Sequence, residues 1–508
     1  MSFHYDFATL RDAILFNAVE VLPSNSQQLD QEIQTLIDNA NLTGEPIRHY
    51  IGFEISGQIH IGTGIMSALK IKKLQDVGVK CSIFLADYHT YLNEKLDGKM
   101  ETIRRVAVDY FGPIMLKCCQ VVGCDLEKID IILAENEYEK KVNDQNYLSF
   151  YLKIAKEITL SRVLKSVSVM GKSAGESVDF GTLCYPIMQV ADAFFMQTHL
   201  VHAGLDQRKC HVLMRETAPK LDKNYSLKIG PKQIKPIAIH HSLLLGIDKP
   251  VTTNINFDLN ELAEESPTLL RSFEHLKENG SVSWQKDHAK ITTEVTTEED
   301  DTLIKDAIKI SQEVQNKAKE VNKMSKSKPD SAIWVHDSFD EILRKLKKAY
   351  CPMPEVELSE KLKLEITDLK VQNPQLALVL QSSELEITTQ SEQIYQIKVI
   401  QNFWQNLQKS STYQQIKIQQ EWNPLLDWCK KMIFPSGKFL EVKRPERFGG
   451  DKIYTSFESL ELDYFLGNLH PLDLKTAVAH CLADWFLPIY QLVHSQSEIL
   501  ELVKNARK

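Results

Sequence analysis

The chain has 508 residues, of which 43% are hydrophobic and 25% charged, so it is long enough to form two or three globular domains. It contains no apolar run of about 18 residues and no basic start of the signal-peptide kind, which argues against a membrane span and against secretion. Its nine cysteines form no CxxC pair, so we expect buried thiols in a reducing cytoplasm and no protein-bound metal.

The net charge of -8 is concentrated in one part of the sequence. Residues 251–320 contain 15 acidic and 8 basic side chains, a balance of -7. The remainder is therefore close to neutral and can carry a basic face for a phosphate-bearing partner.

Short apolar strands alternate with helical patterns through the first half of the chain. Residues 1–46 have helical periodicity throughout. We then expect strands at Arg48–Phe53, Cys81–Ala86, Ile129–Leu133 and Pro236–His240, and helices at about 64–77, 101–122, 145–165 and 187–203. Such alternation predicts an α/β domain with a doubly wound parallel sheet of the Rossmann-like kind.

The turn after the first of these strands could bind a nucleotide. It runs from Tyr50 to Thr63 and opens a helix, where free N–H groups and the helix dipole attract phosphates. Gly57 and Gly62 would let the backbone approach a ligand, and His60 could donate to a phosphate. On these residues alone, the segment could also be a turn that binds no ligand.

A lysine-rich segment, Lys323–Pro329, has hydroxyl residues between its cations. Its small residues and Pro329 favour a loop. A mobile cationic loop suits a reaction in which charge on transferring phosphates must be balanced and no protein nucleophile is needed. By itself, the segment could equally be a solvated basic loop.

A third segment, Tyr185–Asp192, is expected to begin a helix with three polar side chains on one face. Tyr185, Gln189 and Asp192 are spaced four and three residues apart. Polar groups converging from one face suit a small ligand with several hydrogen-bonding groups, although a water-facing helix edge remains the alternative. Gly204–His211 follows shortly after this helix.

The first two segments together resemble the HIGH and KMSKS signatures of class I aminoacyl-tRNA synthetases. They read His60–Thr63 and Lys323–Ser327 here, and the second is a perfect match. With the strand at Tyr50, the Tyr185 helix and the turn at Gly204–His211, the chain is similar to the archaeal and eukaryal type of tyrosyl-tRNA synthetase. Leu85–Asn93 resembles a family segment that lines the substrate pocket.

The resemblance implies a set of binding residues. The tyrosine phenol would be bound by Tyr50 and Asp192, and the ammonium group by Tyr185, Gln189 and Gln207, with Glu54 nearby. ATP would be contacted by Gly52, Gly57, His60, Gly62, Thr63 and Lys326. The catalytic residues would be His60, Lys323 and Lys326.

The resemblance continues in Lys345–Pro352, Arg444–Asp451 and Leu469–Lys475. The last two match a mainly α-helical, anticodon-binding C-terminal domain in which Phe448 would stack on a base, and His470 and Asp473 would read base edges. The phosphates would face Lys430, Lys431, Lys438, Lys443, Arg444 and Arg447.

The implied function is that of a tyrosine–tRNA ligase using L-tyrosine, ATP with Mg²⁺ and tRNA(Tyr), as a cytoplasmic homodimer. Two departures stand out: Thr63 replaces the second motif histidine, and Ile55 replaces the usual proline. Because Thr63 carries no charge, adenylate formation is expected to be slower.

Three other functions fit the sequence less well. A P-loop NTPase fails because Ser166 stands where the motif before Gly171-Lys172-Ser173 needs glycine. Tryptophanyl-tRNA synthetase shares the fold, but Asp192 and Tyr50 are placed for a phenol. A synthetase-like paralogue that binds RNA or a partner without charging tRNA has only Thr63 in its favour.

The sequence suggests six segments: a helical N-terminal extension (1–46), the catalytic domain (47–246), an acidic insertion (247–321), the KMSKS loop and its connection (322–352), a second insertion (353–422) and the C-terminal domain (423–508).

Overall fold

The computed structural model describes residues 3–167, 179–250, 281–285, 288–292, 323–324, 329–372 and 390–506. The chain divides into two compact units. The first comprises Met1–Ile247 and Ser325–Lys508, and the second comprises Asp248–Met324. In the second unit, β11 (Ser281–Gln285) pairs antiparallel with β12 (His288–Thr292). The first unit carries the candidate site residues except Lys323, which belongs to the second unit.

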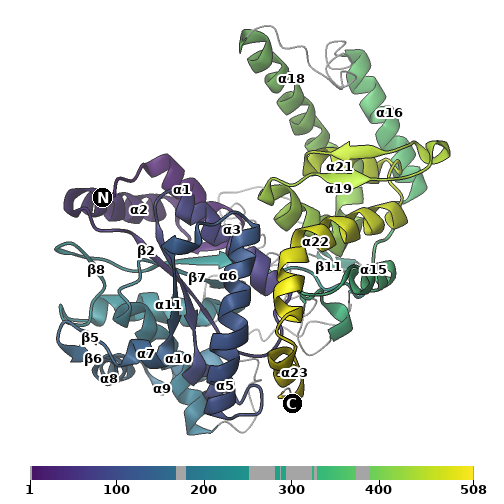
Figure 1. The fold of residues 1–508 in the computed structure, drawn as a ribbon. Helices are drawn as coiled ribbons and strands as arrows, with labels where there is room; N and C mark the ends of the chain where they lie inside the picture. Colours follow the sequence, from purple (N-terminus) through teal and green to yellow (C-terminus); the bar gives the residue numbers. More distant parts are fainter. Residues whose placement is uncertain are drawn as a thin grey trace. The chain divides into compact units, whose positions relative to one another are not determined.

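A six-stranded sheet in the order β1-β10-β7-β2-β3-β4 forms the centre of the N-terminal half (Figure 1). Five of its strands are parallel, and the edge strand β1 is antiparallel to β10. This confirms the doubly wound α/β prediction. The strands are β1 (Ala18–Leu22), β2 (Arg48–Phe53), β3 (Lys80–Leu85), β4 (Ile129–Leu133), β7 (Leu200–Gly204) and β10 (Ile237–His241).

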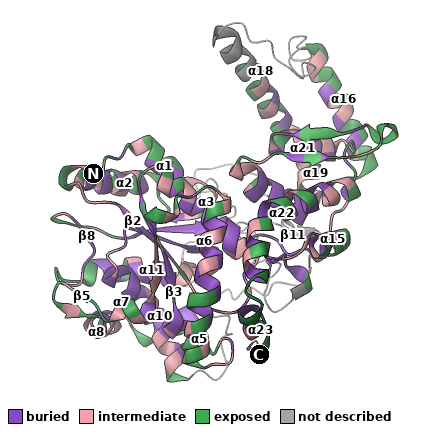
Figure 2. Cartoon of the chain, in the orientation of Figure 1, coloured by how far each residue is buried: buried purple, intermediate pink, exposed green. Residues whose placement is uncertain are grey.

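Helices cover the sheet, and the central strands are buried (Figure 2). One packed pair is α3 (Ile61–Asp76) with α6 (Gly112–Val121). Another group is α10 (Phe180–Phe195) with α8 (Tyr147–Glu157) and α11 (Arg208–Thr217). The core beside α10 contains large aromatic rings, among them Phe84, Phe194 and Phe195.

Two expected elements were wrong. The helix expected at 187–203 ends at Phe195, and the apolar residues Leu200–Gly204 form the strand β7 between β2 and β10. The N-terminal segment contains β1 between its helices α1 (Phe7–Leu15) and α2 (Ser26–Thr43). In both cases a short apolar run gives no periodicity that separates a strand from a helix.

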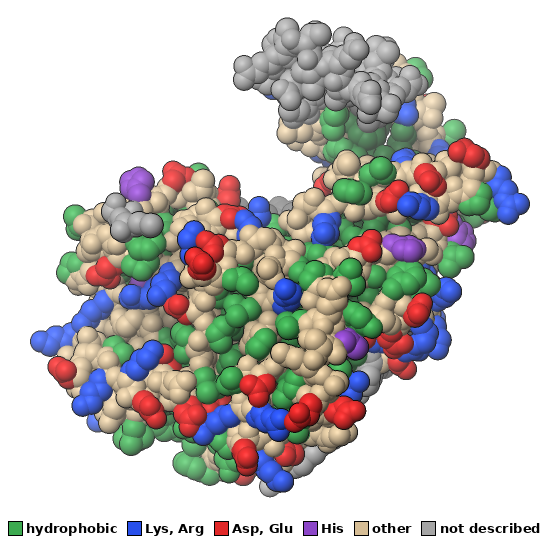
Figure 3. Space-filling view, in the orientation of Figure 1, with side chains coloured by type: hydrophobic (Ala, Val, Ile, Leu, Met, Phe, Trp, Pro, Cys, Tyr) green, Lys and Arg blue, Asp and Glu red, His purple; other side chains and the backbone are tan. Residues whose placement is uncertain are grey.

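The C-terminal part of the first unit is mainly helical, as expected. Its helices are α15 (Phe339–Lys348), α16 (Val356–Gln372), α18 (Gln390–Lys409), α19 (Ser411–Gln419), α20 (Pro424–Trp428), α21 (Phe457–Phe465), α22 (Pro471–His494) and α23 (Ser497–Asn505). Among the described helices, none has both the length and the apolar character to span a membrane. Acidic and basic side chains are interspersed on the face drawn in Figure 3.

Specific hydrogen bonds join this helical part to the sheet domain. The Trp428 indole N–H donates to the Leu245 carbonyl oxygen at 2.9 Å, and the Trp485 indole donates to the Val121 carbonyl oxygen at 3.0 Å. The Ile247 N–H donates to the Ser331 carbonyl oxygen at 3.1 Å. The chain therefore leaves the first unit beside the point where it returns.

A buried lysine joins the N-terminal helix α1 to α3. Lys70 of α3 donates through Nζ to the carbonyl oxygens of Ala13 and Ile14 at 3.0 and 2.9 Å. These carbonyls lie at the C-terminal end of α1, where unpaired acceptors and the helix dipole favour a cation. Burial lowers the pKa of Lys70 to about 7.

This pKa predicts a pH-dependent stability. Between the folded pKa of about 7 and the unfolded value of 10.5, the unfolded chain holds one more proton, so stability rises with pH. The unfolding free energy of wild type, relative to that of Lys70→Met, should rise by ~1 kcal/mol per pH unit from pH 7 to 9 in urea titrations. Lys73→Met, on an exposed part of α3, should show a flat difference. A constant difference for Lys70→Met would contradict the prediction.

Candidate active site

The turn after β2 places His60 at the beginning of α3. His60 caps this helix, because its Nδ1 accepts from the Thr63 N–H at 3.2 Å, and its Nε2 lies 3.2 Å from the Thr63 hydroxyl. Gly57 has φ +108°, a conformation that favours glycine. A Cβ at Gly62 would stand 3.1 Å from His60 Nδ1, so glycine leaves room for the imidazole ring. Thr63 thus contacts the motif histidine directly.

Residues shortly after the lysine-rich loop pair with this turn. The Ile61 N–H donates to the Ile333 carbonyl oxygen, and the Val335 N–H donates to the Ile59 carbonyl oxygen, both at 3.0 Å. Trp334, between these partners, has its ring 6.2 Å from that of His60. The first signature is therefore joined by backbone hydrogen bonds to the segment Ile333–Val335, which follows the second signature in the chain.

Only one of the two lysines predicted to be catalytic lies within the described residues. Lys323 belongs to the second unit, and Lys326 lies outside the described residues. The segment that follows the loop is held by Asp337, whose Oδ2 accepts from the Trp334 N–H at 2.9 Å and from Lys345 Nζ at 2.7 Å.

The helix α10 carries the three polar residues expected on one face. It begins at Phe180 and not at Tyr185, because the Asp179 side chain caps it by accepting from the Thr182 N–H at 2.7 Å. Tyr185 and Asp192 are buried, and Asp192 is only 2% exposed. A water-facing helix edge is thus excluded for these two side chains.

Two tyrosine hydroxyls hold the Asp192 carboxylate. Tyr138 and Tyr147 donate to its Oδ1 at 2.7 and 2.8 Å. His89 Nε2 lies 3.5 Å from Oδ2. Burial raises the pKa of Asp192 to about 7, and the two hydroxyls act in the opposite direction by stabilising the charged form.

Sequence reasoning missed Tyr138 and Tyr147. They belong to α7 (Ala134–Tyr138) and to the first turn of α8, just after β4. The available signal was their position after the carboxyl end of a parallel strand, where ligand sites of doubly wound sheets lie.

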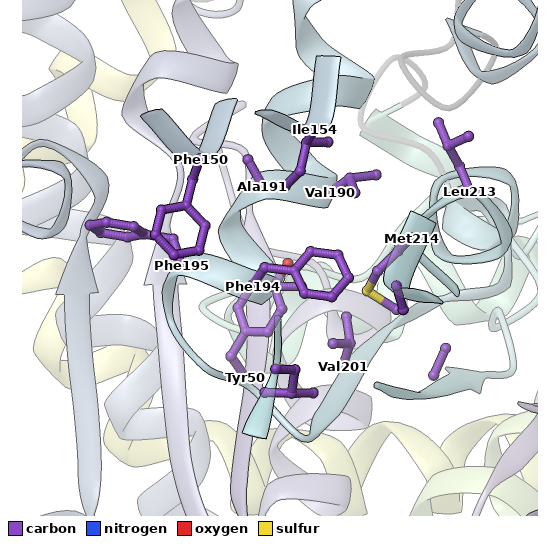
Figure 4. Close-up of a cluster of buried hydrophobic side chains, with 14 of the residues drawn as sticks. Tyr50, Phe150, Ile154, Val190, Ala191, Phe194, Phe195, Val201, Leu213 and Met214 are labelled. Atoms are coloured by element: carbon purple, nitrogen blue, oxygen red, sulfur yellow. The ribbon is translucent and has the colours of Figure 1, made fainter. Parts of the chain in front are cut away.

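Tyr50 approaches Asp192 from β2. Its ring lies edge-on to Phe84, with 6.1 Å between ring centroids, and Figure 4 shows it among the buried side chains of α10 and β7. Burial, together with the nearby charge of Asp192, raises the pKa of Tyr50 well above 10. The structure thus brings together both residues predicted for the phenol.

The remaining predicted residues form a polar group. Gln189 Nε2 donates to Gln207 Oε1 at 3.3 Å, and the buried Gln189 Oε1 has no hydrogen-bond partner. Glu54 Oε1 accepts from Asn93 at 2.8 Å. Burial and the Glu54 carboxylate raise the pKa of Tyr185 well above 10. An unpaired buried acceptor is suited to a ligand that donates hydrogen bonds.

Comparison with known proteins decides the family. The model of the class I tRNA synthetases (W and Y) matches residues 42–250 and 283–397. A tyrosine–tRNA ligase of Thermococcus sibiricus is 34% identical over 485 residues, covering 95% of this chain and 96% of the relative. The chain belongs to the tyrosine–tRNA ligase family.

Other members of the tyrosine–tRNA ligase family agree over similar lengths. The Pyrococcus abyssi ligase is 35% identical over 465 residues, which cover 91% of each chain. The tyrosyl-tRNA synthetase of Pyrococcus horikoshii, solved with L-tyrosine, has 33% identity and a TM-score of 0.67, covering 98% of this chain and 99% of that one. Because these relatives are tyrosine enzymes, the tryptophanyl alternative is not favoured.

The C-terminal residues of this tyrosine–tRNA ligase family member lie near one another. Arg444 joins their loops, since its Nε donates to the Gly450 carbonyl oxygen at 2.9 Å and its Nη1 to that of Asn468 at 2.7 Å. Phe448, 60% exposed, follows Arg444 in the first loop. His470 caps α22 after the second loop, and Asp473 is in the first turn of α22. Arg444 thus holds the surface together.

The buried Asp192 arrangement predicts a pH-dependent loss of stability. Tyr138→Phe and Tyr147→Phe should each lower the unfolding free energy by about 1.5–3 kcal/mol at pH 8, where most Asp192 is charged. The loss should be smaller at pH 5, because the raised pKa leaves Asp192 protonated in the folded chain. Urea titrations at both values measure this, with the half-exposed Tyr91→Phe as control. Equal losses at pH 5 and pH 8 would refute the interpretation.

Proposed function

We propose that the chain activates L-tyrosine with ATP and transfers it to the 3′ end of tRNA(Tyr). In the first step the tyrosine carboxylate attacks the α-phosphorus, and the bond to the departing pyrophosphate breaks. In the second step a ribose hydroxyl at the 3′ end of the tRNA attacks the tyrosyl carbonyl carbon, and AMP leaves. The observation that carries this proposal is the buried Asp192 carboxylate facing Tyr50 inside a synthetase fold.

The phenol of tyrosine is assigned to Asp192 and Tyr50. Oδ1 of Asp192 already accepts from Tyr138 and Tyr147, so Oδ2, toward His89, is the oxygen available for a substrate hydroxyl. A buried acceptor penalises a substrate without that hydroxyl. The pocket should therefore reject phenylalanine.

The ammonium group is assigned to the polar group of residues at Gln189. Its unpaired Oε1 supplies an acceptor, and Glu54 supplies negative charge. Tyr185 and Gln207 would complete the set, since Tyr185 lies beside Glu54 and Gln207 is hydrogen-bonded to Gln189.

ATP phosphates are assigned to the beginning of α3. A helix N-terminus attracts phosphates, and the residues assigned to contact them are Gly52, Gly57, His60, Gly62 and Thr63. ATP would bring Mg²⁺ on its own phosphates. Lys323 and Lys326 would balance the charge that develops during transfer. Because tyrosine, ATP and tRNA meet in the cytoplasm, we place the reaction there.

We also propose a homodimer. Apolar side chains on α8, on α9 (Leu160–Ser166) and at the beginning of α10 are exposed by 49% or more of their surface, and an apolar surface of this kind marks an interaction site. They are Leu148, Leu152, Leu160, Leu164 and Phe180.

Amino-acid-dependent pyrophosphate exchange tests the activity. Wild type should prefer tyrosine over phenylalanine by about 10⁵, a figure known for a tyrosyl-tRNA synthetase and taken over from it. Asp192→Asn should reduce this preference by about a hundredfold, equivalent to ~2.7 kcal/mol. Asp463→Asn is a matched control, because Asp463 also accepts from a tyrosine hydroxyl but lies in the C-terminal part. Unchanged selectivity in Asp192→Asn would show that the pocket is elsewhere.

The C-terminal surface should act in the transfer step alone. Phe448→Ala and Asp473→Ala should weaken tRNA charging by about tenfold or more, since stacking on one base is worth ~1–3 kcal/mol, and should leave pyrophosphate exchange intact. Leu487→Ala, which removes a half-exposed apolar side chain farther along α22, serves as control. Equal loss of exchange and charging in a folded variant would speak for a structural role.

A further inference from the structure

A glutamate of the N-terminal edge strand contacts the turn that carries Gln207. Glu20, on β1, accepts from Arg208 Nε with both carboxylate oxygens at 2.9 Å. Arg208 is the first residue of α11, and Gln207 directly precedes it. The Glu20 side chain is 20% exposed and that of Arg208 37%. The partner of Glu20 is thus the direct neighbour in sequence of Gln207, a proposed tyrosine ligand.

Glu20 holds the same helical turn a second time through two histidines. His240 Nδ1 lies 2.9 Å from Glu20 Oε2, and His240 Nε2 lies 2.9 Å from His211 Nδ1. The carboxylate requires a donor at His240 Nδ1, so Nε2 of a neutral His240 accepts from His211. His211 follows Arg208 by three residues and lies on the same face of α11.

We infer that Glu20 is a positioning residue for tyrosine binding, which fixes the first turn of α11 and so keeps Gln207 in place beside Gln189. This inference rests on the proposed function. The family model begins only at residue 42, so Glu20 lies in a part of the chain that it does not match. Through Glu20, the edge strand β1 supports the tyrosine site. A ligand-binding turn needs such outer support, because displacement by about 1 Å can cost a hundredfold in activity.

The chain offers a matched control at the other end of α11. Glu32 of α2 accepts from Arg215 Nη1 and Nη2 at 3.0 and 2.9 Å. Both pairs join the N-terminal segment to α11, but Arg215 lies in its last turn, away from Gln207. Removing the Glu32 pair should cost stability without moving the tyrosine site.

The experiment compares Glu20→Gln and Glu32→Gln in the full chain by thermal unfolding and pyrophosphate exchange. The amide in Glu20→Gln places an NH₂ group where Arg208 or His240 needs an acceptor. The KM for tyrosine should rise ten- to a hundredfold, while the KM for ATP stays within about twofold. Glu32→Gln should show a lowered melting temperature with both KM values unchanged. Arg208→Lys, which keeps the charge but loses the guanidinium, should show an intermediate rise and serves if Glu20→Gln does not fold.

Three results would overturn the inference while wild type remains active. They are an equal KM for tyrosine in Glu20→Gln and Glu32→Gln, a parallel rise in the KM for ATP, and an unchanged KM for tyrosine in Arg208→Lys. Wild type without tyrosine-dependent exchange would instead overturn the proposed function.

Discussion

A carboxylate removed from water costs several kcal/mol unless donors surround it, and this cost shapes the surroundings of Asp192. Two hydroxyls from α7 and α8 reach one of its oxygens, so the region after β4 must fold over α10. Tyr50 then has to approach from β2, at a depth where its own hydroxyl stays protonated. The order of strands and helices around Asp192 satisfies one buried charge, which is also the group to which we assign the selectivity for tyrosine.

The sequence was informative where a local pattern decides the structure. Strands β2 and β4 have the predicted bounds, because a buried parallel strand between turn residues is recognisable from a few neighbours. The polar face of α10 could likewise be predicted from the spacing of Tyr185, Gln189 and Asp192. In contrast, the sequence pattern predicts the end of a helix where β7 lies, because a five-residue apolar run fits either structure.

Contacts between distant segments were beyond sequence reasoning. Tyr138 and Tyr147 meet Asp192 across 54 and 45 residues. The pairing of Ile59–Ile61 with Ile333–Val335 spans most of the chain. No spacing rule relates such positions, so one sequence could suggest that two signatures cooperate but could not show that the first is hydrogen-bonded to the segment after the second. The N-terminal segment, expected as an extension, is likewise anchored by Lys70, Glu20 and Glu32.

The hydrogen bond between Ile247 and Ser331 joins residues 84 positions apart in the sequence. Ile247, the last residue of the first unit before the chain enters the second, is thus fixed against the part of the chain that follows its return. The hydrogen bond from Trp428 to the nearby Leu245 holds this segment in place. When the two ends of a loop are fixed, the entropic cost of closing the loop grows only slowly with its length. The residues between Ile247 and the lysine-rich segment, 248–322, can therefore lengthen, shorten or diverge over evolutionary time without altering the strand order around Asp192. In this architecture the sheet domain and the segment between Ile247 and Lys323 are free to evolve at different rates.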